Sequence, residues 1–145
     1  MMHVLGVGCL LIGLATTSKP PIRLTPLPSA DGCGCTFSVL SAPDQTILSR
    51  DLDEDGAVIG VNGKAIRLTR SSFGEVHKVQ GHITLGDKFN EVLKGDDVTV
   101  ALEYKATFVC ADDDEGCEVT EYLGTLRVSL GKSRQAFKVA GACGC

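Results

Sequence analysis

Hydrophobic and polar residues alternate along much of this chain, and the alternation is clearest between Val98 and Val109. Apolar side chains occupy every second position of this stretch, and charged or hydroxyl side chains occupy most of the others. Period two over this length predicts a half-buried β-strand, because successive side chains of a strand point to opposite faces. The side chains predicted to share one face are Val98, Val100, Leu102, Tyr104, Ala106 and Phe108.

A hairpin is predicted at Asn62-Gly63, which stands between the β-prone runs 57–61 and 64–69. Asn-Gly favours a type I′ turn, since that turn needs positive φ at both central residues. We expect Ile66 and Leu68 to face the core of the domain.

Weaker patterns predict the remaining elements. Strands are predicted at residues 36–40, 46–49, 75–79, 82–85, 119–130 and 135–140. A single helical turn is predicted at 88–94, and Ser71-Ser72-Phe73-Gly74 is interpreted as a turn. Short strands separated by turn signals indicate an all-β fold, a single antiparallel sandwich or small barrel of about eight strands.

Composition divides the chain into three parts. Residues 1–18 contain an apolar run from Val4 to Ala15, which has the length of a signal-peptide core and is short for a transmembrane helix. A signal peptide or an N-terminal anchor is predicted there. Residues 19–32 hold four of the five prolines and predict a semi-rigid tether. Residues 33–145 form the predicted β-domain.

The charge and the aromatic content narrow the range of partners. The formal net charge is −4, which argues against nucleic acid as a partner, because nucleic-acid binding favours a basic face. There is no Trp, and five Phe and two Tyr supply few stacking surfaces for bases or sugars. The expected partner is a protein or a component of the cell envelope, with membrane contact only through an uncleaved N-terminal segment.

Seven cysteines are a high count for 145 residues. One lies in the apolar leader, and the other six are Cys33, Cys35, Cys110, Cys117, Cys143 and Cys145. An even number in the domain predicts a disulfide framework and therefore a secreted or periplasmic protein. Cys110 and Cys117 flank an acidic loop between two predicted strands, so we predict a bond between them.

Two matched elements, Cys33-Gly34-Cys35 and Cys143-Gly144-Cys145, are expected to meet in space. In one interpretation their cysteines form disulfides that tie the first strand to the last and close a loop of about 100 residues. In a second, their four thiolates bind Cu(I) or Zn²⁺, although zinc sites usually have a longer spacing. In a third, they are redox active, although the Cys-x-x-Cys motif is absent.

Asp51, Asp53 and Asp55 match the first half of a calcium-binding loop. Carboxylates at these alternate positions can converge on one hard cation. Position 12 of such a loop is Asn62 here, which cannot supply the bidentate carboxylate of Glu. A calcium-stabilised module and a solvated charged turn are the two alternatives.

The sequence contains no nucleophile elbow, phosphate loop or zinc-protease motif. His77 and His82 are the only histidines of the predicted domain, and on a strand their spacing places them on opposite faces. We expect no enzymatic activity and no resident cofactor, with Ca²⁺ or Cu/Zn as the alternative.

Two stretches carry a resemblance. Cys33-Gly34-Cys35-Thr36-Phe37 and Val139-Ala140-Gly141-Ala142-Cys143-Gly144-Cys145 resemble uncharacterised exported bacterial proteins with a CGC element at each end. The resemblance covers the two ends of the domain and the hairpin around Gly63, and it implies no activity. The prediction is a non-enzymatic exported β-domain with a structural or binding role; a copper or zinc protein and a calcium module are the alternatives.

Overall fold

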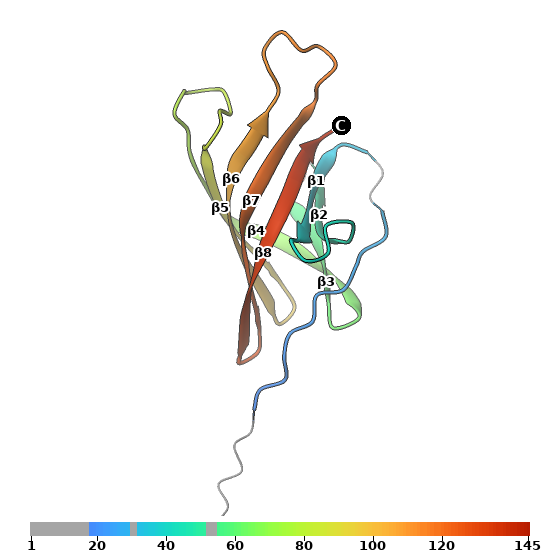
Figure 1. Cartoon of the computed structure of the whole chain (residues 1–145). Coiled ribbons are helices and arrows are strands. Elements are labelled where there is room, and N and C mark those ends of the chain that lie inside the picture. Colours follow the sequence, from blue (N-terminus) through green and yellow to red (C-terminus); the bar gives the residue numbers. More distant parts are fainter. Residues whose placement is uncertain (1–17, 30–31, 52–54) are drawn as a thin grey trace, which may run out of the picture.

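The chain folds into a closed antiparallel β-barrel (Figure 1). The computed structural model describes residues 18–29, 32–51 and 55–145, and this part contains no helix, hence none that could span a membrane. Successive strands pair with one another, and the last strand pairs with the first. The strands are β1 Gly34–Val39, β2 Thr46–Asp51, β3 Gly56–Val61, β4 Lys64–Val76, β5 Lys88–Gly95, β6 Val98–Val109, β7 Val119–Leu130 and β8 Ser133–Gly144.

Local sequence signals placed several elements correctly. β6 and β7 span 98–109 and 119–130, as predicted. Asn62 and Gly63 have φ of 48° and 80°, which confirms the predicted two-residue turn. Leu68 is buried and Ile66 packs against the core, so the inward face of β4 is also confirmed.

The predicted helical turn at 88–94 is wrong, because this segment is strand β5. It pairs with β4 on one side and β6 on the other. Its inward side chains are Phe89, Glu91 and Leu93, all buried. Buried and exposed positions alternate regularly along β5. Because one of the buried residues is Glu91, the hydrophobicity pattern alone does not show this alternation.

β4 is longer than predicted and continues to Val76. The turn expected at 71–74 is therefore wrong, and so are the separate strands expected at 75–79 and 82–85. Residues 77–87 form a loop whose only strand-like pairing is a bridge between Val79 and His82.

Three β-bulges change which side chains face inward. A bulge adds one residue to one strand of a pair and so shifts the alternation beyond it. The added residues are Ile47 in β2, Ser71 in β4 and Thr107 in β6. The bulge at Thr107 explains why Phe108 is 44% exposed, although the unbroken alternation predicted that it shares the buried face of β6.

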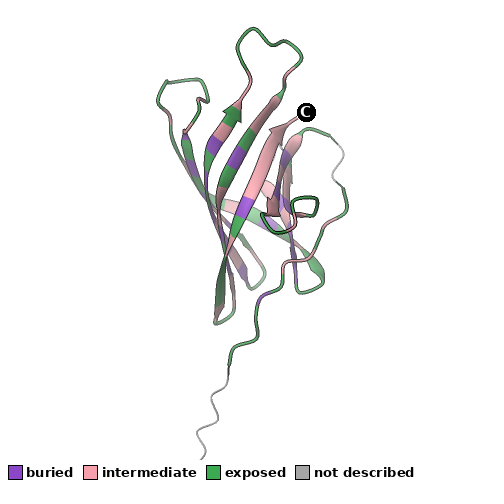
Figure 2. Ribbon diagram, viewed as in Figure 1, coloured by how far each residue is buried: buried purple, intermediate pink, exposed green. Residues whose placement is uncertain are grey.

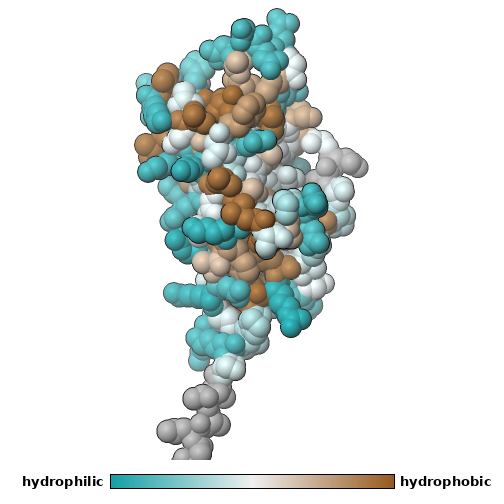
Figure 3. All heavy atoms as spheres, viewed as in Figure 1, coloured by the Kyte–Doolittle hydropathy of each residue, from teal (hydrophilic) through white to brown (hydrophobic). Residues whose placement is uncertain are grey.

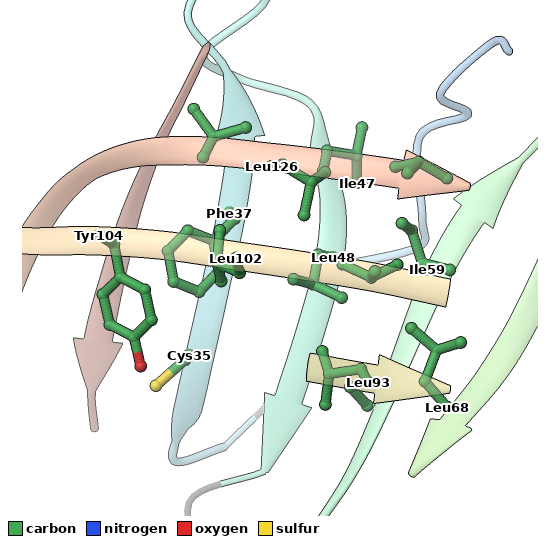
Figure 4. Close-up of a cluster of buried hydrophobic side chains, with 14 of the residues drawn as sticks. Cys35, Phe37, Ile47, Leu48, Ile59, Leu68, Leu93, Leu102, Tyr104 and Leu126 are labelled. Carbon is green, nitrogen blue, oxygen red and sulfur yellow. The ribbon is translucent and has the colours of Figure 1, made fainter. Parts of the chain in front are cut away.

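The interior of the barrel is filled by inward side chains from all eight strands (Figures 2 and 4). Buried and exposed residues alternate along the strands in Figure 2. In Figure 4, Tyr104 and Cys35 lie at one end of the labelled cluster, and Ile59 and Leu68 lie at the other. The packed core therefore continues up to the end of the barrel that carries Cys35.

The described part of the proline-rich segment packs against the barrel rather than projecting from it as a free tether. β2 and β3 pair at only two positions before they separate. Here Thr25 donates its backbone N–H to the Gly60 carbonyl of β3 at 2.9 Å, and Leu27 donates to the Thr46 carbonyl of β2 at 2.7 Å. Ile22 is buried in the core cluster. The segment thus completes the wall where these two strands diverge.

The predicted disulfide framework is present. The bonds join Cys33 to Cys145, Cys35 to Cys143, and Cys110 to Cys117. Cys35 and Cys143 are direct partners in the β1–β8 ladder. The two Cys-Gly-Cys elements therefore meet, as expected, and they fasten the seam that closes the barrel.

A glycine in β8 is required for packing at this seam. The Phe37 ring occupies the place that a Cβ of residue 141 would take. We predict that Gly141→Ala lowers the free energy of unfolding by about 1–3 kcal/mol, because the ring must move within a packed core. Urea unfolding measures this. Gly116→Ala is the control, since its Cβ would lie 3.7 Å from the nearest atom; equal effects of the two substitutions would refute the packing argument.

The two seam disulfides should be redundant in stability. Their sequence separations are 112 and 108, so either bond alone closes almost the same loop in the unfolded chain. We predict that Cys33→Ala/Cys145→Ala costs little, whereas replacing all four seam cysteines by alanine costs about 4–5 kcal/mol. Denaturant unfolding of the two variants tests this non-additivity. A full cost already in the first variant would contradict it.

Candidate functional site

The candidate site is a pocket of ≈ 330 Å³ at one end of the barrel. β1 begins and β8 ends here, and loop 77–87 and the β6–β7 hairpin rise beside it (Figure 1). We call this end the mouth, and the cavity the mouth pocket. Its lining residues are Cys35, Arg50, Phe73, Glu75, Ile83, Phe89, Tyr104, Thr120, Tyr122, Cys143 and Gly144.

Aromatic rings form much of the pocket wall. The ring of Phe89 is stacked on that of Tyr104, with centroids 5.2 Å apart, and it meets Tyr122 edge-on at 5.6 Å. Tyr104 and Tyr122 are themselves 5.1 Å apart, and Phe37 and Phe73 extend the cluster. Five of the seven aromatic residues therefore gather at the mouth, so the small aromatic count of the sequence is concentrated in one place.

The bulge in β4 helps to build this wall. Before it, Arg70 is the register partner of Leu93; beyond it, Phe73 is the partner of Glu91. Without the added residue at Ser71, the alternation of β4 would turn Phe73 to the outer face. The bulge therefore brings Phe73 and Glu75 to the mouth pocket.

A charged pair lies beneath the aromatic rings. Arg50 Nη1 donates a hydrogen bond to Glu91 Oε2 at 2.8 Å. The Glu91 side chain is 1% exposed and that of Arg50 is 13% exposed. Burial raises the pKa of Glu91, and the guanidinium of Arg50 opposes that rise. Such a pair is costly to bury, because each charged group loses its hydration.

Not every N–H donor of the Arg50 guanidinium has a hydrogen-bond acceptor in the described part of the chain. Its Nη2 donates to the sulfur of Cys35 at 3.4 Å, and sulfur is a weak acceptor. The side chain of Arg50 also forms a hydrogen-bond contact with the Tyr104 hydroxyl. Its Nε is buried and has no acceptor among the residues that the structure describes. A buried donor without a partner carries a free-energy cost, which a bound acceptor would remove.

The two tyrosine hydroxyls of the pocket are neutral groups, and each has a side-chain hydrogen-bond partner: Arg50 for Tyr104 and Thr120 for Tyr122. Burial raises the pKa of Tyr104 and of Tyr122, since an apolar environment disfavours the phenolate. The pocket thus combines apolar ring faces with a few hydrogen-bonding groups, which is the usual composition of a small-ligand site.

Loop 77–87 beside the mouth is organised by Asp87, which is 1% exposed. Its carboxylate accepts hydrogen bonds from the backbone N–H groups of Lys78 at 2.9 Å and Thr84 at 2.7 Å. It also lies 3.0 Å from Nδ1 of His77, whose Nε2 lies 2.9 Å from Glu75. Burial alone would raise the pKa of Asp87, but these hydrogen bonds outweigh it and hold that pKa well below its usual range.

Neither His77 nor His82 lies on a β-strand. Both lie in loop 77–87, so the expectation of opposite strand faces does not apply. His77 contacts Asp87 and Glu75, and their hydrogen bonds raise the pKa of its imidazole. His82 pairs with Val79 through its backbone, in an isolated β-bridge.

The structure tests the predicted metal ligands only in part. The four thiols of the copper or zinc alternative are paired in disulfides here, so that alternative applies only to a reduced protein. For calcium, Asp55 forms an ion pair with Arg70, Asp51 is exposed at the end of β2, and Asp53 lies outside the described residues. Within the described ranges no group of three or more His, Cys, Asp or Glu side chains is placed to hold a metal ion.

A second hollow of ≈ 720 Å³ lies on the outer wall of β5 to β8. Two pairs of polar side chains lie in or beside this hollow. Glu103 and Arg127 are 3.0 Å apart and more than half exposed, and Lys138 donates to Thr125 at 2.9 Å. This outer groove is larger than the mouth pocket, but the charged pair beside it is exposed to solvent rather than buried.

Neither a family model, nor a curated protein, nor a solved structure matches this chain. No motif or local pattern in the sequence marks Arg50, Glu91 or Asp87 as a site residue. Arg50 and Glu91 are 41 positions apart, so their contact leaves no local signal.

The His77–Asp87 contact predicts a pH dependence of loop 77–87. A raised pKa of His77 means a contribution to loop stability that is present below about pH 6.5 and lost as the pH rises through the folded-state pKa. The lowered pKa of Asp87 means a contribution present above about pH 3.9 and lost as the pH falls through its folded-state value. The protection of the loop amides, measured relative to their intrinsic exchange rate at each pH, should therefore be greatest between these limits.

An NMR titration of the His77 ring checks the cause. Asp87→Asn should lower the pKa of His77, because it removes the larger of the two acceptor effects. Glu115→Gln, in the acidic β6–β7 hairpin, is the control and should leave it unchanged. An unaltered His77 pKa in Asp87→Asn would show that the contact does not exist in solution.

Proposed function

We propose that this protein is an exported, non-enzymatic binding protein that takes up a small ligand through the mouth pocket. The observation that carries the proposal is the combination of a clustered aromatic wall with a largely buried guanidinium whose Nε has no acceptor among the described residues. Mouths of β-barrels are common ligand sites, and a barrel of eight strands has room for side chains and one small ligand.

Export is supported by the disulfides. Three bonds in one domain are consistent with an extracellular or periplasmic protein, because reducing compartments do not maintain structural disulfides. We infer that a signal peptide in residues 1–18 directs this export; residues 1–17 lie outside the described part of the chain.

The rim of the mouth supports a ligand or partner from the cell envelope. Exposed apolar side chains occur at the end of β4 and in loop 77–87; they are Val76, Val79, Ile83 and Leu85. Figure 3 shows hydrophobic positions gathered in the upper part of one face of the barrel, below a hydrophilic tip. An apolar ligand would pass such a rim more easily than a charged one.

A matched pair of substitutions on β7 tests the site. Thr120 lines the mouth pocket, and Thr125 lines the outer groove. We predict that the neutral probe N-phenyl-1-naphthylamine gains fluorescence on binding the wild type. Thr120→Tyr should weaken this binding roughly 10-fold or more by filling the pocket, which corresponds to about 1.4 kcal/mol.

Thr125→Tyr is the control and should bind the probe as the wild type does. Loss of binding only in Thr125→Tyr would move the site to the outer groove. Absence of saturable binding in the wild type would refute a small-ligand function.

A further inference from the structure

The unused hydrogen-bond donors of Arg50 indicate which ligand the mouth pocket selects. A guanidinium carries five N–H donors. Among the described residues Arg50 donates to Glu91 and to the Cys35 sulfur and contacts the Tyr104 hydroxyl, whereas its Nε has no acceptor. The side chain lines the pocket, so a ligand there lies beside a guanidinium that Glu91 contacts through Nη1 alone.

The charges around the pocket favour an uncharged acceptor. Glu91 already balances the positive charge of Arg50 at 2.8 Å. Arg70 is the next cation, but it forms an ion pair with Asp55 and lies over the Phe73 ring. Glu75 adds a carboxylate to the pocket lining, and it faces His77. A carboxylate ligand would therefore meet no unbalanced positive charge and would lose its hydration on entry.

The remaining lining favours a flat apolar body. Phe89, Tyr104 and Tyr122 present ring faces and edges to one another at centroid distances of 5.1–5.6 Å, and a planar ring system can join such a cluster. The pocket volume of ≈ 330 Å³ limits the ligand to a compact molecule.

We propose that the mouth pocket selects compact, uncharged ring compounds that carry a carbonyl oxygen, and that the Arg50 guanidinium donates a hydrogen bond to that oxygen. This inference rests on the proposed function, since it names the ligand class of the same site. The ring lies against the aromatic wall, and the carbonyl points to β2.

Three ligands of similar shape separate the contributions. They are 2-acetonaphthone with a neutral carbonyl, 2-ethylnaphthalene without an acceptor, and 2-naphthoate with a carboxylate. We expect the ketone to bind the wild type at least 10-fold more tightly than either of the others, because a hydrogen bond to a charged donor is worth roughly that factor or more. Titration calorimetry or ligand fluorescence measures the affinities, and the protein has no Trp to interfere with the latter.

Two double variants test the role of Arg50. Arg50→Met/Glu91→Met removes both charges together, so that neither is left buried without its partner. It should keep the affinity for 2-ethylnaphthalene within about threefold and lose the preference for the ketone. The matched control is Arg127→Met/Glu103→Met, which removes an exposed cross-strand pair of the outer wall and should keep the preference.

The outcomes distinguish this inference from the proposed function. Equal binding of all three ligands to the wild type would overturn the selection of a carbonyl while leaving a binding pocket. Tighter binding of 2-naphthoate would overturn the preference for an uncharged ligand. No binding of any of the three would count against the proposed function itself. The wild-type comparison decides these points even if the mouth variant fails to fold.

Discussion

The structure depends on the closure of the barrel between β1 and β8. Cys35 and Cys143 face each other in this ladder and are covalently joined, and a second bond joins Cys33 to Cys145 just beyond it. Closure leaves no unpaired edge at either terminal strand, which protects a β-rich chain from pairing with other chains. The inner of the two bonds also lies in the wall of the mouth pocket, so one feature serves stability and the site.

The interior of the barrel changes character along its length. Around Leu48 and Leu93 it is a packed apolar core, whereas nearer the mouth the same two strands, β2 and β5, contribute Arg50 and Glu91. The bulge at Ser71 turns the end of β4 inward at this level and so adds an aromatic wall above the charged pair. Every strand except β3 therefore carries both core residues and pocket residues, and a small barrel obtains a candidate site without a separate domain.

Sequence reasoning found the elements of the site without finding the site. It identified every cysteine of the seam and placed β6 and β7, which carry Tyr104 and Tyr122. It missed β5, because Glu91 interrupts the apolar pattern that marks an inward face. It also missed the partnership of Glu91 with Arg50, since residues 41 positions apart are brought together only when the barrel closes.

The sequence by itself determined the local structure: the type I′ turn at Asn62-Gly63, the alternation of 98–109, and a cysteine pattern suited to disulfides. These features depend on the φ preferences, side-chain period and chemistry of neighbouring residues. Only the tertiary structure decided between sandwich and barrel, the positions of the bulges, and the packing of Ile22 against the core. Those features depend on which distant strands pair and in what register. Short-range sequence patterns do not specify this pairing.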